Sequence, residues 1–125
     1  MVEPIQAAVF SQLARGFRNV ILTGHSLGGA LATIMAVYIQ KRNPRATVSC
    51  RAFGMPRLGN PAWADYVDAT LGTDAQHLNN FIDVVPQLPS RNFGYQQSSN
   101  EIWIADDHGK EYRACAGQEN KVGQE

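Results

Sequence analysis

One serine stands in a setting that could make its hydroxyl a nucleophile. Ser26 lies in the run Thr23-Gly24-His25-Ser26-Leu27-Gly28-Gly29, which contains a G-x-S-x-G pattern. The pattern is informative where a strand meets a helix, because that junction holds the serine on a strained turn with its hydroxyl exposed. We interpret Ser26 as a nucleophile and the backbone N–H of Leu27, at the expected helix start, as a donor to an oxyanion beside it. The alternative is that Ser26 only caps the helix.

The glycines around Ser26 are expected to serve the turn. Gly24 and Gly28 lie two residues on either side of the serine, where side chains would crowd the backbone, and Gly29 would let the helix pack closely on the strand. The chain has neither G-x-G-x-x-G nor G-x-x-x-x-G-K-[S/T]. A dinucleotide site and a P-loop are therefore rejected.

A nucleophilic serine needs a base to take its proton and an acid to orient that base, in the order Ser, Asp or Glu, His on this kind of sheet. We expect Asp83 to be the acid, because it follows an apolar strand at the edge where parallel sheets place their sites. His25 and His77 precede Asp83; we expect His25 to pack beneath the turn and His77 to be a core or edge residue. His108 alone follows the acid and is the candidate base, although Asp106-Asp107-His108-Gly109 is typical of a hairpin turn.

Hydrophobic periodicity predicts the elements that position these residues. In chain order they are a helix over 4–15, a strand over 20–22, a helix to about 40, a strand over 46–53, a helix over 61–71 capped by Asn60, a strand over 78–82, and a hairpin of 101–104 with 111–114. Strands separated by helices predict an α/β fold with a mainly parallel sheet, helices on both faces and a C-terminal antiparallel hairpin. Residues 1–125 are expected to form a single domain, with 116–125 as a loop or tail.

Composition narrows the class of function. Eleven Lys and Arg balance eleven Asp and Glu, and without a block of like charge nothing favours nucleic acid as a partner. No apolar stretch is long enough to span a membrane, and the start of the chain does not resemble a signal peptide. Cys50 and Cys115 are too few and too far apart for a disulfide framework or a Cys-x-x-Cys metal site. We expect no metal and no cofactor, and the disulfide state of the two cysteines stays open.

Three segments, in the same order, resemble the fungal-type class 3 lipase family of α/β-hydrolases. They are Ile21 to Ala32 around the serine, Phe53-Gly54-Met55-Pro56-Arg57-Leu58-Gly59-Asn60, and Asn80 to Pro89 around Asp83. The resemblance implies that Ser26 is the nucleophile, Asp83 the triad acid and the Leu27 amide half of the oxyanion hole, with a structural role for the loop from Gly54 to Asn60. It also implies an incomplete domain, whose lid, second oxyanion donor and histidine segment lie outside residues 1–125.

The function implied by the resemblance is that of a carboxylic-ester hydrolase working through an acyl-enzyme. The substrates would be triacylglycerol or related lipid esters, met at a lipid–water interface by a secreted protein. The alternative is a catalytically silent lipase-like fragment or interaction module that lacks the triad histidine. In either case, we expect strands missing beside the nucleophile strand to leave a sheet edge exposed.

Overall fold

The strands of the described chain lie in the sheet in the same order as in the sequence. The computed structural model describes residues 2–119, and its five strands are β1 (Asn19–His25), β2 (Thr47–Phe53), β3 (Ala75–Asn80), β4 (Glu101–Ile104) and β5 (Tyr112–Ala114). Neighbours from β1 to β4 run parallel, whereas β4 and β5 are antiparallel. The mainly parallel sheet and the C-terminal hairpin predicted from the sequence are confirmed.

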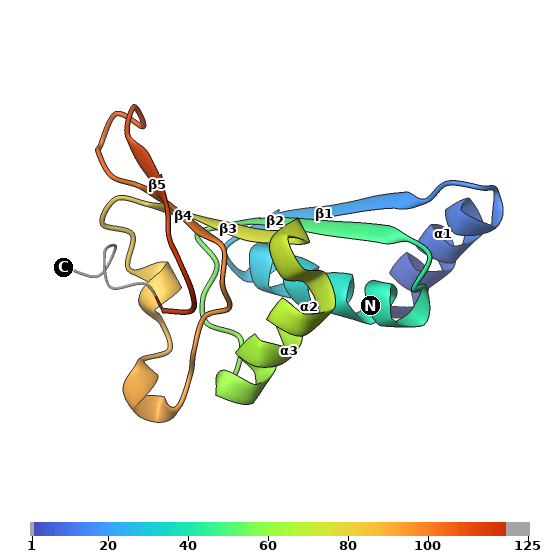
Figure 1. Cartoon of the computed structure of the whole chain (residues 1–125), viewed down its shortest axis with the longest axis horizontal. Coiled ribbons are helices and arrows are strands. Elements are labelled where there is room, and N and C mark those ends of the chain that lie inside the picture. The colour runs from blue at the N-terminus through green and yellow to red at the C-terminus, as the bar shows by residue number, and fades with distance from the viewer. Residues whose placement is uncertain (1, 120–125) are drawn as a thin grey trace.

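The three α-helices within residues 2–119 cover one face of the sheet. They are α1 (Val2–Ala14), α2 (Leu27–Arg42) and α3 (Pro61–Leu71), and Figure 1 shows them on the same side of the strands. The expectation of helices on both faces is therefore wrong for the described chain. The reason is topological. Each new strand is added on the same side of the preceding one, and right-handed crossovers in one direction place every crossover helix on the same face of the sheet.

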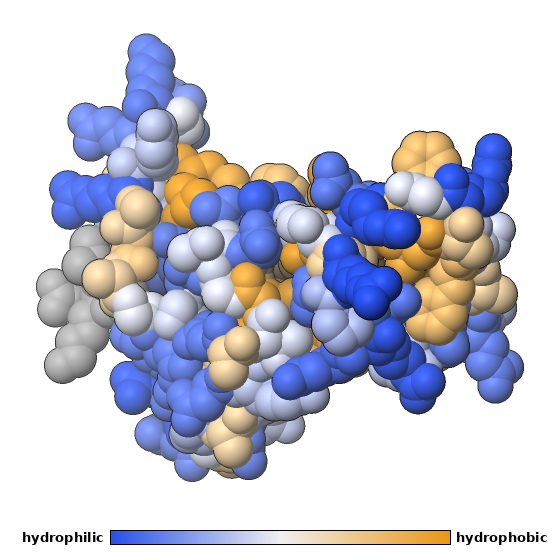
Figure 2. Space-filling model, turned by 45° about the vertical axis from the view of Figure 1, so that its right-hand side comes forward, coloured by the Kyte–Doolittle hydropathy of each residue, from blue (hydrophilic) through white to orange (hydrophobic). Residues whose placement is uncertain are grey.

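The opposite face of β1 is open, and β1 is an edge strand of the described sheet. Exposed and half-buried residues alternate along it, and Ile21 on the outer row is 73% exposed. Figure 2 shows apolar surface on the right-hand side of the molecule, toward the end where α1 and the start of β1 lie. The sheet edge expected beside the nucleophile strand is present, with backbone groups on one side that pair with no other described strand.

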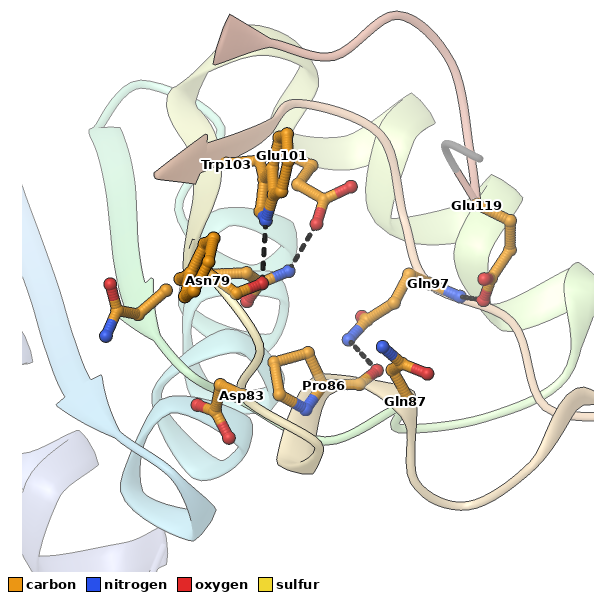
Figure 3. A pocket seen from close by; sticks show the side chains of 10 residues that line it. Asn79, Asp83, Pro86, Gln87, Gln97, Glu101, Trp103 and Glu119 are labelled. Carbon is orange, nitrogen blue, oxygen red and sulfur yellow. Dashed lines mark hydrogen bonds between the residues drawn. The ribbon is translucent and has the colours of Figure 1, made fainter. Parts of the chain in front are cut away.

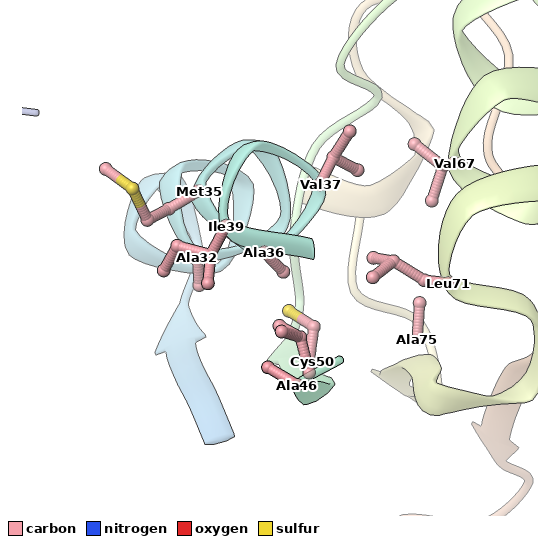
Figure 4. Packing of buried hydrophobic residues seen from close by; sticks show 11 residues of the cluster. Ala32, Met35, Ala36, Val37, Ile39, Ala46, Cys50, Val67, Leu71 and Ala75 are labelled. Carbon is pink, nitrogen blue, oxygen red and sulfur yellow. The ribbon is translucent and has the colours of Figure 1, made fainter. Parts of the chain in front are cut away.

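The hydrophobic core lies between α2, β2 and α3. In Figure 4, Val37 on α2 points toward Val67 and Leu71 on α3, and Ala36 lies over Cys50 of β2. Alanines on this face of α2 let the helix approach the sheet closely.

The two cysteines are free thiols. Cys50 is fully buried in the core, where burial raises the pKa of its thiol above the ordinary value. Cys115 is partly exposed, and its thiol pKa is also raised by burial. Both groups are thus held as neutral thiols, which react slowly.

The third strand begins and ends earlier than the sequence pattern predicts. The sequence predicts a strand over 78–82, whereas β3 spans Ala75–Asn80. The pattern misleads because the inward-facing side chains of β3 include His77 and Asn79, both buried. His77 Nε2 pairs with the carbonyl oxygen of Ser98 at 3.0 Å, and Asn79 Nδ2 donates to Glu101 Oε1 at 2.6 Å. Buried polar groups that are hydrogen-bonded can replace apolar residues in a strand.

Replacing Ile39 by Ala should lower the free energy of unfolding by about 2–5 kcal/mol, because the residue is fully buried and its loss leaves a cavity. Ile34 lies on the same helix but is 46% exposed, so Ile34→Ala should cost about 1 kcal/mol or less. Urea denaturation of both variants measures the difference. Equal losses would contradict the placement of the core.

Replacing Ile21 by Lys should raise the concentration at which the chain aggregates, because a charge on the outer row of an edge strand opposes pairing with another chain. The melting temperature should change little, since the side chain is exposed. The measurement is light scattering against concentration, beside Val20→Lys, whose side chain faces the helices and which should unfold the protein. Unchanged aggregation in Ile21→Lys would show that association does not use this edge.

Candidate active site

Ser26 sits alone between the end of β1 and the start of α2. Its backbone has φ 54° and ψ −125°, a region that non-glycine residues adopt only under strain, at a cost of about 1–3 kcal/mol. Neighbouring elements hold it there: its N–H donates to the Phe53 carbonyl at 2.8 Å, and its own carbonyl accepts from the N–H of Ala30 at 3.2 Å. The strand, tight turn and helix predicted from the sequence are confirmed.

Two of the three glycines near Ser26 are required by close packing. A Cβ on Gly24 would stand 2.3 Å from the Gly28 carbonyl carbon, and one on Gly29 would stand 3.1 Å from the Cβ atoms of Ala52 and Met55. Gly28 differs from the prediction, because a Cβ there would meet no described atom within 4 Å. Of the two glycines that flank the serine, a side chain would therefore clash at Gly24 only, while Gly28 faces open space in the described chain.

The backbone N–H of Leu27 lies directly beside the serine. Leu27 is the first residue of α2, so its amide is one of the first-turn N–H groups that have no acceptor within the helix. The positive end of the helix dipole acts at the same place. Both effects favour negative charge next to Ser26, which is the property that an oxyanion site needs.

Asp83 lies in the loop that follows β3. Its carboxylate oxygen Oδ1 accepts the N–H of Val85 at 3.0 Å, and its own N–H donates to the Asn80 carbonyl at 2.8 Å. Its other oxygen, Oδ2, would stand 2.8 Å from a Cβ on Gly54. The carboxylate is thus fixed by the loop on one side and bounded by the end of β2 on the other.

Ser26, Gly54 and Asp83 lie at one edge of the sheet. In the parallel register, His25, Phe53 and Leu78 are aligned at the carboxyl ends of β1, β2 and β3, and the three residues follow these ends. Since neighbouring strands are about 4.8 Å apart, β1 and β3 are separated by about 10 Å, with β2 between them. This leaves room for a side chain between the hydroxyl and the carboxylate. The catalytic roles of Ser26 and Asp83 stay predictions.

Two of the three histidines are held elsewhere. His77 is 2% exposed, and burial lowers the pKa of its imidazole, which is thus neutral at pH 7. His108 lies in the turn of the β4–β5 hairpin, which projects from the sheet (Figure 1). Its side chain is largely exposed, with Nε2 3.4 Å from the carboxylate of the adjacent Asp107. The structure brings neither residue to Ser26 or Asp83.

His25 does not pack beneath the turn, as the sequence had suggested. Its side chain is exposed, because the alternation of side chains along β1 puts it on the open face of the sheet with Ile21 and Thr23. Its Nε2 would stand 3.6 Å from a Cβ on Gly54. His25 and the Asp83 carboxylate therefore border the same glycine from two sides.

Exposed apolar side chains surround this edge of the sheet. They come from the residue after the serine, from the end of β2 and from the loop around the acid, and comprise Leu27, Phe53, Ile82, Val84 and Leu88. Scattered exposed apolar residues are ordinary, whereas a contiguous apolar patch is typical of a surface that contacts an apolar ligand or partner.

A polar pocket is lined in part by Asp83 (Figure 3). Asn79 and Glu101 form one wall, and Gln97 with Glu119 forms the other. Trp103 closes the pocket on the sheet side, where its Nε1 donates to the Phe81 carbonyl at 3.0 Å. The loop that carries the acid is thus tied to β4 as well as to β3.

A serine on a strained strand-to-helix turn, beside a carboxylate that follows a neighbouring parallel strand, is the arrangement found in α/β-hydrolases. The family model described as Lipase (class 3) matches residues 2–93, and the chain belongs to that family. The family resemblance inferred from the three sequence segments is confirmed.

Among the relatives of this chain are proteins named as secreted mono- and diacylglycerol lipases from Malassezia. One, from Malassezia globosa, is 41% identical over 105 residues, which cover 84% of this chain and 34% of the relative. The other, from Malassezia restricta, is 39% identical over 106 residues, with 85% and 35% covered. The chain therefore spans about a third of the length of these curated relatives.

Solved lipases share the fold. Lipase II from Rhizopus niveus has a TM-score of 0.88 against this chain at 32% identity, covering 98% of this chain and 47% of the lipase. The triacylglyceride lipase of Rhizomucor miehei has a TM-score of 0.87 at 30% identity, covering 97% of this chain and 47% of the lipase.

Among the described residues, no helix has the length and apolar character needed to cross a membrane.

Replacing Gly54 by Ala should displace the Asp83 carboxylate, because the new Cβ would stand 2.8 Å from Oδ2 and the backbone has φ +56°. We expect a loss of about 1–3 kcal/mol in unfolding free energy. Gly72→Ala is a matched control, since Gly72 has φ +53° but nothing within 4 Å of its Cβ position. Urea denaturation and the NMR shifts of Asp83 and Val85 measure the effects, and equal perturbation of these shifts by both variants would contradict the contact.

Proposed function

We propose that this chain carries the nucleophile and the acid of a lipase-type carboxylic-ester hydrolase. The observation that carries the proposal is Ser26 on its strained turn at the start of α2, with Asp83 at the same edge of the sheet. The Ser26 hydroxyl attacks the ester carbonyl while a base takes its proton, and a tetrahedral oxyanion forms. Collapse of this intermediate expels the alcohol, protonated by the same base, and leaves an acyl-enzyme that water hydrolyses.

Each described group has one role in this scheme. The Leu27 amide and the positive end of α2 stabilise the oxyanion as charge develops. Asp83 orients the base and stabilises its protonated form. The base itself is His108 or a histidine outside residues 1–125, and the hairpin position of His108 favours the latter.

Lipid esters are the substrates that the site favours. The apolar side chains around the serine and the acid suit a fatty acyl chain, whose transfer from water gains about 0.8 kcal/mol per buried CH₂. The relatives carry the names of mono- and diacylglycerol lipases and of a triacylglyceride lipase. We therefore infer an acylglycerol substrate at a lipid–water interface and, since the Malassezia relatives are described as secreted, a secreted protein.

The second candidate is a lipase-like module without turnover. It is favoured by one observation, namely that His77 and His108 both lie away from Ser26 and Asp83. A fluorophosphonate probe separates the two functions, because it labels a serine activated by a working base. In a full-length protein that contains this chain, labelling that is lost in Ser26→Ala supports the hydrolase. Absence of labelling supports the silent module.

In a full-length active protein, Ser26→Ala should lower kcat for p-nitrophenyl butyrate on the order of 10⁴-fold or more, because the nucleophile is lost. Asp83→Asn should lower kcat in the same direction, since the base loses its orientation. Residues 1–125 alone should hydrolyse the ester feebly, and His108→Ala should not change that rate. Robust hydrolysis by the 125-residue chain, abolished by both Ser26→Ala and His108→Ala, would assign the base to His108.

A further inference from the structure

We propose that Arg57 is a positioning residue for the triad acid: its guanidinium holds the loop of residues 84–89, the acid loop, and through that loop sets the orientation of the Asp83 carboxylate. The inference rests on the proposed role of Asp83. Arg57 lies in the segment between β2 and α3, which the family resemblance had assigned a structural role alone. It does not touch the reacting atoms and acts through the acid loop.

Arg57 donates hydrogen bonds to three consecutive carbonyl groups of the acid loop. Its backbone N–H donates to the Leu88 carbonyl at 2.7 Å. Its Nη1 donates to the carbonyl of Gln87 and, at 3.0 Å, to that of Pro89. The residue is 5% exposed, so these bonds are shielded from competition with water. The guanidinium thus holds the carbonyls of Gln87 and Pro89, and the backbone N–H holds the one between them.

A buried carboxylate fixes the guanidinium in turn. Glu119 accepts from Arg57 Nε at 2.6 Å and from Nη2 at 2.9 Å, and both side chains are 4% exposed. This two-point pairing sets the plane of the guanidinium as well as neutralising its charge. Lysine cannot reproduce it, because an ammonium group is a point charge without the planar fork.

Hydrogen bonds of Gln97 connect Glu119 to the acid loop by a second route (Figure 3). The Gln97 backbone N–H donates to Glu119 Oε1 at 2.6 Å. The buried Gln97 side chain donates through Nε2 to the Met55 carbonyl at 3.1 Å and to the Pro86 carbonyl at 3.4 Å. The acid loop is thus held at Pro86 as well as at residues 87–89, by one connected network of buried polar groups.

The connection to the carboxylate runs through Val85. Its N–H donates to Asp83 Oδ1 at 3.0 Å, and Val85 begins the short helical turn, Val85–Gln87, whose last carbonyl Arg57 holds. On its other side the carboxylate is bounded by Gly54, three residues before Arg57. Arg57 therefore fixes the spacing between the two segments that enclose Asp83. A shift of the acid loop moves the donor to Oδ1 and rotates the carboxylate.

The test compares Arg57 with a second arginine of the same kind. Arg51 Nη1 also donates to two backbone carbonyls, of Cys50 at 2.9 Å and of Asp74 at 2.6 Å, but away from the acid loop. Amide hydrogen exchange is measured at Val85 and, as an internal reference, at the amides of α2, which contains neither Arg57 nor Arg51. We expect Arg57→Gln to raise the rate at Val85 relative to α2 about tenfold or more, and Arg51→Gln to leave that ratio unchanged.

Further variants keep the test decisive. Arg57→Lys should give an intermediate ratio, and it decides on the same measure if Arg57→Gln does not fold. Glu119→Gln should raise the ratio less than Arg57→Gln, because the carbonyl contacts remain. An unchanged ratio in the folded Arg57 variants would overturn the proposal, since the guanidinium would then stabilise the fold without holding the acid loop.

A kinetic measurement links the loop to the chemistry. In an active, full-length protein, Arg57→Gln should lower kcat for p-nitrophenyl butyrate about tenfold with KM unchanged, because the acid is misplaced while substrate contacts remain. A normal kcat in the same variant would overturn the proposal. Full activity in Ser26→Ala would instead refute the proposed function, and the exchange ratio at Val85 would still report whether Arg57 holds the loop.

Discussion

The fold depends on keeping a serine in a backbone conformation that its side chain disfavours. Ser26 stays at positive φ because three elements hold it at once: β1 delivers it, the Phe53 carbonyl of β2 binds its N–H, and α2 starts directly after it. Gly24 and Gly29 remove the side chains that would push these elements apart. The burial of α2 against β2 and α3 offsets this backbone strain. The conformation of the serine turn therefore depends on the packing of the alanine-rich core.

The two sides of the site are stabilised by different physics. The serine side rests on apolar packing, in which small residues let a helix lie close to the sheet. The acid side rests on buried polar groups, including an arginine–glutamate pair, the Gln97 amide and the hydrogen bonds of Asn79. Apolar packing is non-directional, whereas a buried ion pair with fixed hydrogen bonds also sets orientation. That difference suits a carboxylate, whose orientation matters more than its depth.

Local signals in the sequence were sufficient for much of the fold and for the placement of Ser26 and Asp83. The G-x-S-x-G turn, the Asn60 cap of α3 and the hairpin follow from short-range chemistry, and each is present. The limits of β3 were missed because its inward row includes His77 and Asn79, whose burial depends on partners distant in sequence. The outward position of His25 and the contacts of Arg57 likewise depend on strand register and on residues up to 62 positions away. Periodicity carries no information about such partners.

The open side of β1 has a mechanical consequence. In the described chain, the strand that delivers the serine is hydrogen-bonded to a neighbour on one side only, whereas the strand that delivers the acid is flanked on both. Ser26 therefore follows a strand that is supported on one side, whereas Asp83 follows a strand that is supported on both sides. Thermal motion and strain relief should both concentrate at β1. A segment that paired with the open side of β1 would stiffen that strand and so limit the movement of Ser26.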